Sequence, residues 1–214
     1  MTAPSAREPW VIGVSGASGT PYARSVLNAL LDATLPVDLV VSKAARLTVL
    51  DETGIALRDA HWKDDVARWL GREELADLTY WTAGDLAAGP SSGSYRTRGM
   101  VVVPASTAAV AGIALGLSKD LLQRAADVTL KERRRLVVVP RETPLTRATL
   151  RHLLTLDEAG ATVLPASPAF YAGANEVDAL VDFVAGKVLD ALGIDHMLFR
   201  RWTGELGRGR VEER

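Results

Sequence analysis

The chain has 214 residues, no cysteine, three scattered histidines and a formal net charge of -1. Without cysteine it forms neither a disulfide nor a thiolate metal site, and its charge provides no overall field to attract nucleic acid or an anionic membrane. The length suits one domain with a sizeable core, and no apolar stretch approaches the roughly 20 residues of a membrane span. Because the first residues lack the basic start and apolar run of a signal peptide, we expect a cytoplasmic protein.

Five apolar segments predict buried parallel strands, and segments with helical periodicity separate them. The strands are expected at about 10–15, 37–41, 99–103, 135–139 and 161–164. This alternation indicates βαβ units, so the sequence predicts an α/β fold with a single doubly wound domain and a mainly parallel sheet. We expect the domain to cover 10–203, between a flexible N-terminus (1–9) and a polar C-terminal tail (204–214).

Short polar residues are expected to cap several of the helices. Ser42, Ser118 and Thr146 each stand just before a helical pattern. An apolar stripe from Val177 to Val188 predicts a late helix. The Gly/Ser/Pro-rich connection at 82–98 is unusually long, and loops of that length are usually functional or disordered.

The first strand runs into the loop GVSGASGT (13–20) and then a helix, which predicts an anion cradle. Glycines let the backbone approach a ligand, and a helix N-terminus offers free N–H groups and a positive dipole end. A simple strand-to-helix turn would use the same residues. The loop is not a P-loop, because no Gly-Lys-Ser/Thr follows it. The glycine spacing, and a second strand that ends in Ser42 rather than in an acid, suit a mononucleotide such as FMN better than NAD.

The later strands end in further candidate site residues. After 99–103 the chain continues with Pro104 to Thr107 and a helix of small residues, which allow either a flat ring or a neighbouring backbone to come close. The strand at 135–139 ends in Arg141 and Glu142. An arginine can stabilise an anionic leaving group, and a glutamate beside it can accept a proton. An ordinary surface ion pair would show the same two residues in the sequence.

Several separated motifs together resemble the UbiX-type flavin prenyltransferases, within the homo-oligomeric flavin-containing decarboxylase-like proteins. The motifs are GVSGASG (13–19), VVSKAA (40–45), MVVVPAS (100–106), LLQRAADVTLKERRRLVVVPRETPL (121–145), GATVLPASPAFY (160–171) and KVLDALGID (187–195). The resemblance implies a Rossmann-like fold and a homododecamer that joins a dimethylallyl unit, from dimethylallyl phosphate, to N5 and C6 of reduced FMN. The prenylated FMN then serves UbiD-type decarboxylases, and no metal is implied.

The resemblance also implies roles for individual residues. The flavin is expected to contact Gly16, Ala17, Ser18, Ser42, Ser106, Thr107, Ala108, Ala109 and Arg124. The prenyl phosphate is expected to be surrounded by Lys131, Arg141, Tyr171 and Lys187. Glu142 is expected to take the proton released from the flavin, and Glu52 to line the same pocket. Since five charges in a row cannot all enter one pocket, we expect Arg133, Arg134 and Arg135 to be structural or to lie at subunit contacts.

Two positions depart from the family pattern. The run after Ser106 often ends in threonine in the family but ends in Ala109 here, so a hydroxyl is lost. Lys187 stands where many members have arginine, which keeps the charge but not the two-pronged geometry.

Two other functions are weighed against prenyl transfer. An FMN-dependent decarboxylase of the same superfamily would use an early histidine and a cysteine on a mobile flap, whereas the first histidine here is His61 and there is no cysteine. A non-catalytic flavin carrier would tolerate the loss of Lys131, Arg141 and Glu142, all of which are present.

Overall fold

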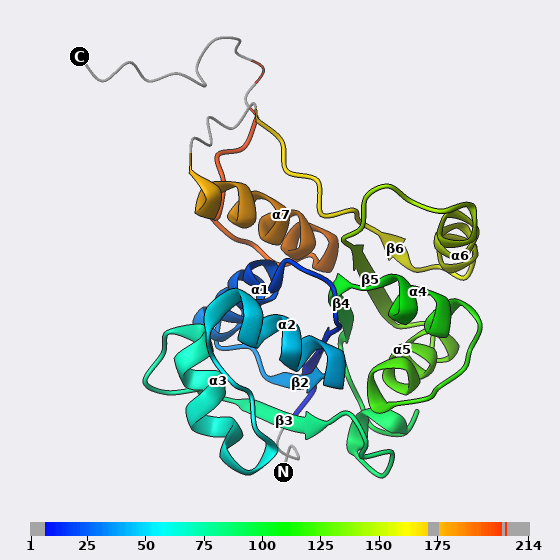
Figure 1. Cartoon of the computed structure of the whole chain (residues 1–214), viewed down its shortest axis with the longest axis horizontal. Coiled ribbons are helices and arrows are strands. Elements are labelled where there is room, and N and C mark those ends of the chain that lie inside the picture. Colours follow the sequence, from blue (N-terminus) through cyan, green and yellow to red (C-terminus); the bar gives the residue numbers. More distant parts are fainter. Residues whose placement is uncertain (1–6, 171–175, 203, 205–214) are drawn as a thin grey trace, which may run out of the picture.

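The structure is a computed structural model, and residues 7–170, 176–202 and 204 are described. A six-stranded, entirely parallel sheet runs through its centre in the order β3-β2-β1-β4-β5-β6 (Figure 1). The strands are β1 (Trp10–Val14), β2 (Val37–Val41), β3 (Leu78–Thr82), β4 (Gly99–Ala105), β5 (Arg135–Pro140) and β6 (Thr162–Val163). The predicted α/β fold with a parallel sheet is confirmed.

Helices cover both faces of the sheet. They are α1 (Thr20–Asp32), α2 (Lys43–Thr53), α3 (Trp62–Leu70), α4 (Thr107–Ala114), α5 (Leu121–Lys131), α6 (Arg147–Glu158) and α7 (Val177–Leu192). Because successive strand residues point to opposite faces, Ile12 of β1 joins a core with α1, α2, α3 and α7, whereas Val11 joins a second core with α4, α5 and α6. No described helix combines the length and the apolar character needed to cross a bilayer.

Strand β3 is an element that the sequence analysis missed. Its segment LTYWT is short, is followed by Ala83 and Gly84, and has four partly exposed residues. It pairs with β2 at the sheet edge, where only Leu78 is buried. An edge strand needs less apolar character than a central one, so a continuous apolar run is the wrong signal for it.

The predicted caps at Ser42 and Thr146 are confirmed, but the one at Ser118 is wrong. The cap of α5 is Asp120, whose carboxylate accepts from the Gln123 amide at 2.9 Å. Ser118 instead has a left-handed backbone, with φ of 49°. Two suitable capping residues lie close together here, and spacing alone does not decide between them.

Two ion pairs of the half-buried Arg7 tie the residues before β1 to the sheet. Arg7, which the sequence analysis assigned to a flexible end, donates to Asp38 and to Asp77, both at 2.7 Å. Asp38 is fully buried and also accepts from the Tyr95 hydroxyl at 2.9 Å. Burial and the charge of Asp38 raise the pKa of Tyr95 to about 12. The long connection is therefore anchored at its far end.

Candidate active site

The direction of winding reverses between β1 and β4, which are neighbours in the centre of the sheet. From β1 the chain continues to β2 on one side, and from β4 it continues to β5 on the other. Open parallel sheets bind ligands outside the carboxyl ends of the strands at such a switch point. Ser15 follows β1 and Ser106 follows β4, so the motifs predicted to form a site do meet here.

Ser15 joins the two strand ends. Its hydroxyl donates to the Pro104 carbonyl and accepts from the Ser106 amide, both at 2.7 Å, and only 2% of Ser15 is exposed. The Ser15 amide also donates to the Pro104 carbonyl at 3.2 Å. This buried hydroxyl fixes the spacing between the first loop and the start of α4.

A cavity of about 420 Å³ opens over these strand ends. It is lined by Ser15, Gly16, Ser42, Lys43, Ala44, Ala83, Gly84, Ser106, Ala108, Ala109, Lys119, Asp120, Leu122 and Gln123. The first turns of α2, α4 and α5 all contribute to this lining. Ser42 and Ser106 cap two of these helices, accepting from amides three residues ahead at 3.1 and 3.2 Å. The starts of α2 and α4, capped by neutral serines, favour an anionic ligand, whereas the start of α5 already holds the Asp120 carboxylate.

Gly16 allows the first loop to pass close to α2. A Cβ atom added at Gly16 would lie 2.4 Å from the Cβ of Ala44, so no larger residue fits without a backbone shift. The glycine is therefore required by the narrow approach of two segments that both line the cavity.

We expect Gly16→Ala to weaken both folding and ligand binding. Forcing a methyl group into this contact costs about 1–3 kcal/mol, and the loop must move away from the cavity to relieve it. The thermal midpoint should fall, and flavin affinity measured by fluorescence quenching should fall with it. The stability control is Gly84→Ala, whose added Cβ meets no atom within 4 Å. An unchanged flavin affinity in Gly16→Ala would show that this loop does not shape the binding site.

The start of α1 is already occupied, contrary to the expectation of free N–H groups there. Glu52, in the last turn of α2, accepts from the amides of Gly19 and Thr20 at 2.8 Å and from the Thr20 hydroxyl at 2.6 Å. Burial opposes ionisation of Glu52, but these hydrogen bonds, with one from Ser18, lower its pKa. A protein carboxylate thus fills the anion position of α1, as Asp120 does for α5, and an incoming anion is directed to the starts of α2 and α4.

Arg141 and Glu142 lie at the same edge of the sheet. The Arg141 amide donates to the Ala105 carbonyl at 3.3 Å, and its Nε donates to the Ser18 carbonyl at 3.0 Å. Glu142 is exposed, and one of its carboxylate oxygens accepts from the Thr143 amide at 3.0 Å. The carboxyl edge therefore brings together the first loop, Glu52, Arg141 and Glu142.

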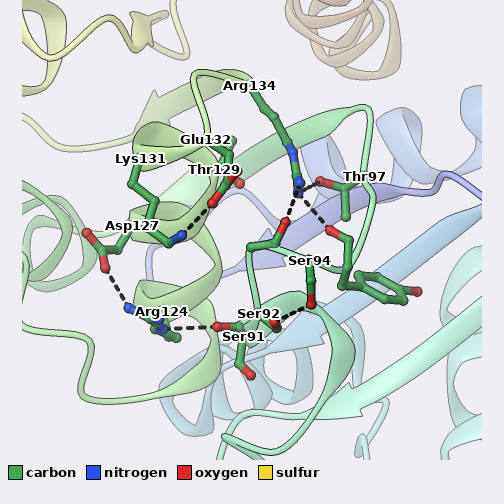
Figure 2. A network of polar contacts seen from close by, with 12 residues as sticks. Ser91, Ser92, Ser94, Thr97, Arg124, Asp127, Thr129, Lys131, Glu132 and Arg134 are labelled. Carbon is green, nitrogen blue, oxygen red and sulfur yellow. Dashed lines mark hydrogen bonds and ion pairs between the residues drawn. The ribbon is translucent and has the colours of Figure 1, made fainter.

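Arg124 is one turn into α5, but its side chain is not part of the cavity lining. Its Nε donates to the Ser91 carbonyl at 3.1 Å, and it forms an ion pair with Asp127 at 2.9 Å. Figure 2 shows how Arg124 and Arg134 hold the long connection at two points, since Arg134 donates to the carbonyls of Gly93 and Tyr95. In this chain Arg124 orders the connection beside the site.

The remaining predicted cations lie elsewhere in the chain. Lys131 ends α5 and precedes β5, whereas Arg141 follows β5, and the six residues of that strand span about 20 Å. Lys131 is paired with Glu132 (Figure 2) and lines a separate cavity of about 490 Å³. Lys187 lies on α7, about 8 Å before its end, and pairs with Asp190 at 3.3 Å. Tyr171 lies outside the described residues.

Several lining residues were not among the predicted ones. These residues are Lys43, Lys119 and Gln123, which lie at or next to helix starts, whereas Ser15 belongs to the loop predicted to bind an anion. These lining residues could have been predicted from the capping positions. Residues next to an N-cap at the carboxyl edge of a parallel sheet face the same crevice.

Known proteins resemble this chain over nearly its whole length. Residues 2–189 match the Flavoprotein family. Flavin prenyltransferase UbiX from Streptomyces coelicolor is 67% identical over 212 residues, covering 94% of this chain and 98% of the relative. The crystal structure of AnUbiX (PadA1) in complex with FMN and dimethylallyl pyrophosphate is 40% identical, with a TM-score of 0.83, and covers 93% of this chain and 99% of that one.

A dodecameric FMN-dependent UbiX-like decarboxylase from Escherichia coli O157:H7 is similarly close. It is 41% identical, with a TM-score of 0.82, and covers 92% of this chain and all of its own. The crevice at the β1–β4 switch point, with three helix starts facing it, is the kind of site that a phosphorylated cofactor requires. With its sequence matches, this fold and this crevice, the chain belongs to the Flavoprotein family and, within it, to the UbiX-type flavin prenyltransferases.

Proposed function

We propose that the chain transfers a dimethylallyl unit from dimethylallyl phosphate to reduced FMN, giving prenylated FMN. The observation that supports this most is the crevice of about 420 Å³, which lies at the sheet edge that also holds Arg141 and Glu142. A phosphorylated cofactor would find the positive starts of α2 and α4 there, and a second phosphate would find a cation beside a carboxylate.

The residues present fit FMN. Gly16 keeps the first loop close to α2, and Ser42 and Ser106 hold two helix starts against the crevice. We propose that the FMN-binding residues are Gly16, Ala17, Ser18, Ser42, Ser106, Thr107, Ala108, Ala109 and Arg124, with Arg124 acting through the connection that it orders. When bound, reduced FMN supplies the electron-rich ring that accepts the prenyl group.

The charged side chains have separate tasks in this proposal. As the allylic C–O bond breaks, the departing phosphate is stabilised by cations placed where its charge develops, and Arg141 is one of these. Glu142 accepts the proton that leaves the alkylated ring. Glu52 holds Ser18, Gly19 and Thr20 in place and keeps the start of α1 closed to the phosphate.

Lys131 and Lys187 are proposed to bind the prenyl phosphate, with Tyr171, across subunits. In one chain Lys131 and Arg141 lie at opposite ends of β5, so both serve one site only if they come from different copies. The dodecameric assembly of the E. coli relative supports this arrangement. We therefore propose a homododecamer whose sites are completed by neighbouring subunits.

A mass measurement tests the proposed function. The protein is incubated without oxygen with reduced FMN and either dimethylallyl phosphate or dimethylallyl pyrophosphate, and the flavin is then analysed by mass spectrometry. We expect a flavin heavier by one dimethylallyl unit, and the two donors show which leaving group is preferred. Unchanged FMN with both donors would contradict the proposal and favour a flavin carrier.

Release of CO₂ from an added carboxylic acid would instead indicate the decarboxylase alternative. The absence of cysteine disfavours the cysteine-dependent form of that alternative.

We further propose that the enzyme acts in the cytoplasm on the small molecules named above, and that a UbiD-type decarboxylase receives the product.

A further inference from the structure

A third cavity, of about 720 Å³, lies at the opposite edge of the sheet from the flavin crevice and shares Arg133, Arg134 and Gly160 with the cavity that Lys131 lines. Its lining comes from the start of β1, the approaches to β4 and β5, the start of β6 and the end of α7. The lining residues are Trp10, Arg98, Arg133, Arg134, Arg135, Gly160, Thr162 and Leu192. Four of these are arginines, and none is acidic.

These four arginines form no ion pair with a described carboxylate, as is also true of Arg24, Arg141, Arg147 and Arg151, but unlike those they lie together in one lining. Among the described residues, ion pairs with carboxylates occupy Arg7, Arg46, Arg58, Arg68, Arg72, Arg96, Arg124 and Arg201. No described carboxylate forms an ion pair with Arg98, Arg133, Arg134 or Arg135, and the bonds of Arg98 and Arg134 go to carbonyls and a hydroxyl. Glu132 does not line the cavity and is bound to Lys131. Four guanidinium groups therefore gather on one open, shallow face of the molecule.

The backbone at Arg133 is held in a conformation that favours glycine. Its φ is 55°, and the Arg133 and Arg134 amides donate to the carbonyls of Leu130 and Thr129 at 2.9 Å. These two bonds form the motif that ends many helices on a left-handed glycine. Helices α2, α3 and α7 do end on left-handed glycines, at Gly54, Gly71 and Gly193. An arginine in this conformation costs stability that a glycine would not, as Thr34, Ala76 and Ser118 also do elsewhere in the described residues.

We propose that this arginine-lined cavity is a binding site for an oligophosphate, a chain of two or more phosphate groups. A guanidinium matches phosphate geometry with two donors, and a surface region of one sign of charge attracts a ligand of the opposite sign. The lining is too large for one phosphate ion, and its arginines are divided between the approaches to β4 and β5, which suits a ligand with several charges. The Thr162 hydroxyl offers a further donor in the same lining.

The test uses the full-length, FMN-loaded protein and inorganic tripolyphosphate, titrated by calorimetry. We expect the parent to bind, and Arg133→Gly to lose about tenfold or more in affinity, as removal of a charged hydrogen-bond donor predicts. Because glycine relieves the left-handed strain, the thermal midpoint of Arg133→Gly should not fall, so lost binding will not reflect misfolding. Arg151→Ala, on the exposed face of α6, is the charge-matched control and should bind within about twofold of the parent.

Arg141→Ala separates this site from the prenyl-phosphate site and should keep tripolyphosphate binding. ATP, ADP and pyrophosphate show whether the bound phosphate chain belongs to a nucleotide. If ATP and ADP bind more tightly than pyrophosphate, and Arg133→Gly loses this binding, the ligand is a nucleotide. The reverse order of affinities identifies a free oligophosphate. No binding by the parent, or binding lost in Arg141→Ala and kept in Arg133→Gly, would overturn the proposal. A third result would also overturn it: the parent binds no tripolyphosphate, and Arg133→Gly lowers the oligomer mass measured by light scattering. The arginine face would then be a contact between copies of the chain. The flavin assay is independent of all these outcomes.

Discussion

Replacing Glu142 by glutamine is expected to reduce the rate of flavin prenylation by about 10²- to 10⁴-fold, the usual contribution of a positioned general base. Glutamine has nearly the same shape, and its carbonyl oxygen can still accept from the Thr143 amide, so the loop after β5 should keep its conformation. It cannot, however, take a proton from the ring. Turnover is measured from the mass of the flavin product over time.

The binding of FMN separates this effect from damage to the site. Glu142→Gln should quench flavin fluorescence with the parent affinity, because Glu142 is not part of the crevice lining. Glu158→Gln, at the exposed end of α6, is the matched control and should turn over at the parent rate. A Glu142→Gln enzyme as fast as the parent would remove Glu142 from the mechanism.

Co-expression of Lys131→Ala with Arg141→Ala is expected to restore activity that neither variant has alone. Each substitution removes a cation from the departing phosphate, and one such group is typically worth about 10²- to 10³-fold in rate. In mixed oligomers some sites take an intact Lys131 from one subunit and an intact Arg141 from another. For equal amounts and random assembly, about one quarter of the sites should recover both.

The control co-expresses Lys131→Ala with the Lys131→Ala/Arg141→Ala double variant, in which no subunit carries Lys131. That mixture should stay inactive at the same total protein and the same oligomer mass. If the first mixture also stays inactive although the subunits are shown to mix, Lys131 does not complete a neighbour's site, and its pairing with Glu132 is structural.

The central part of the fold and its ligand edge were predictable because local signals agree there. The apolar runs of β1, β2, β4 and β5 are buried on both faces, and Ser42 and Ser106 cap helices directly after strands. Strand β3 was not predictable in this way, because an edge strand is only partly buried. The choice between Ser118 and Asp120 as a cap depended on backbone geometry that composition does not determine.

The long-range contacts at the site were the least predictable part. Glu52 caps α1 from 33 residues away, and nothing in the spacing of the first loop indicates that its helix end is already neutralised. The motif that carries Lys131 and Arg141 is continuous in sequence, yet β5 separates them by its full length. These two residues are close in sequence but far apart in space, because an extended strand has a larger rise per residue than a helix.

The Ser15 hydroxyl has a consequence for the thermodynamics of cofactor uptake. Because it bonds the Pro104 carbonyl and the Ser106 amide at once, the carboxyl ends of β1 and β4 are already joined by hydrogen bonds before any cofactor arrives. Ordering of loops on association would subtract from affinity, and a crevice whose floor is already rigid avoids that loss. The favourable free energy of contact with the cofactor then contributes to its affinity, so the flavin is retained tightly during the reaction.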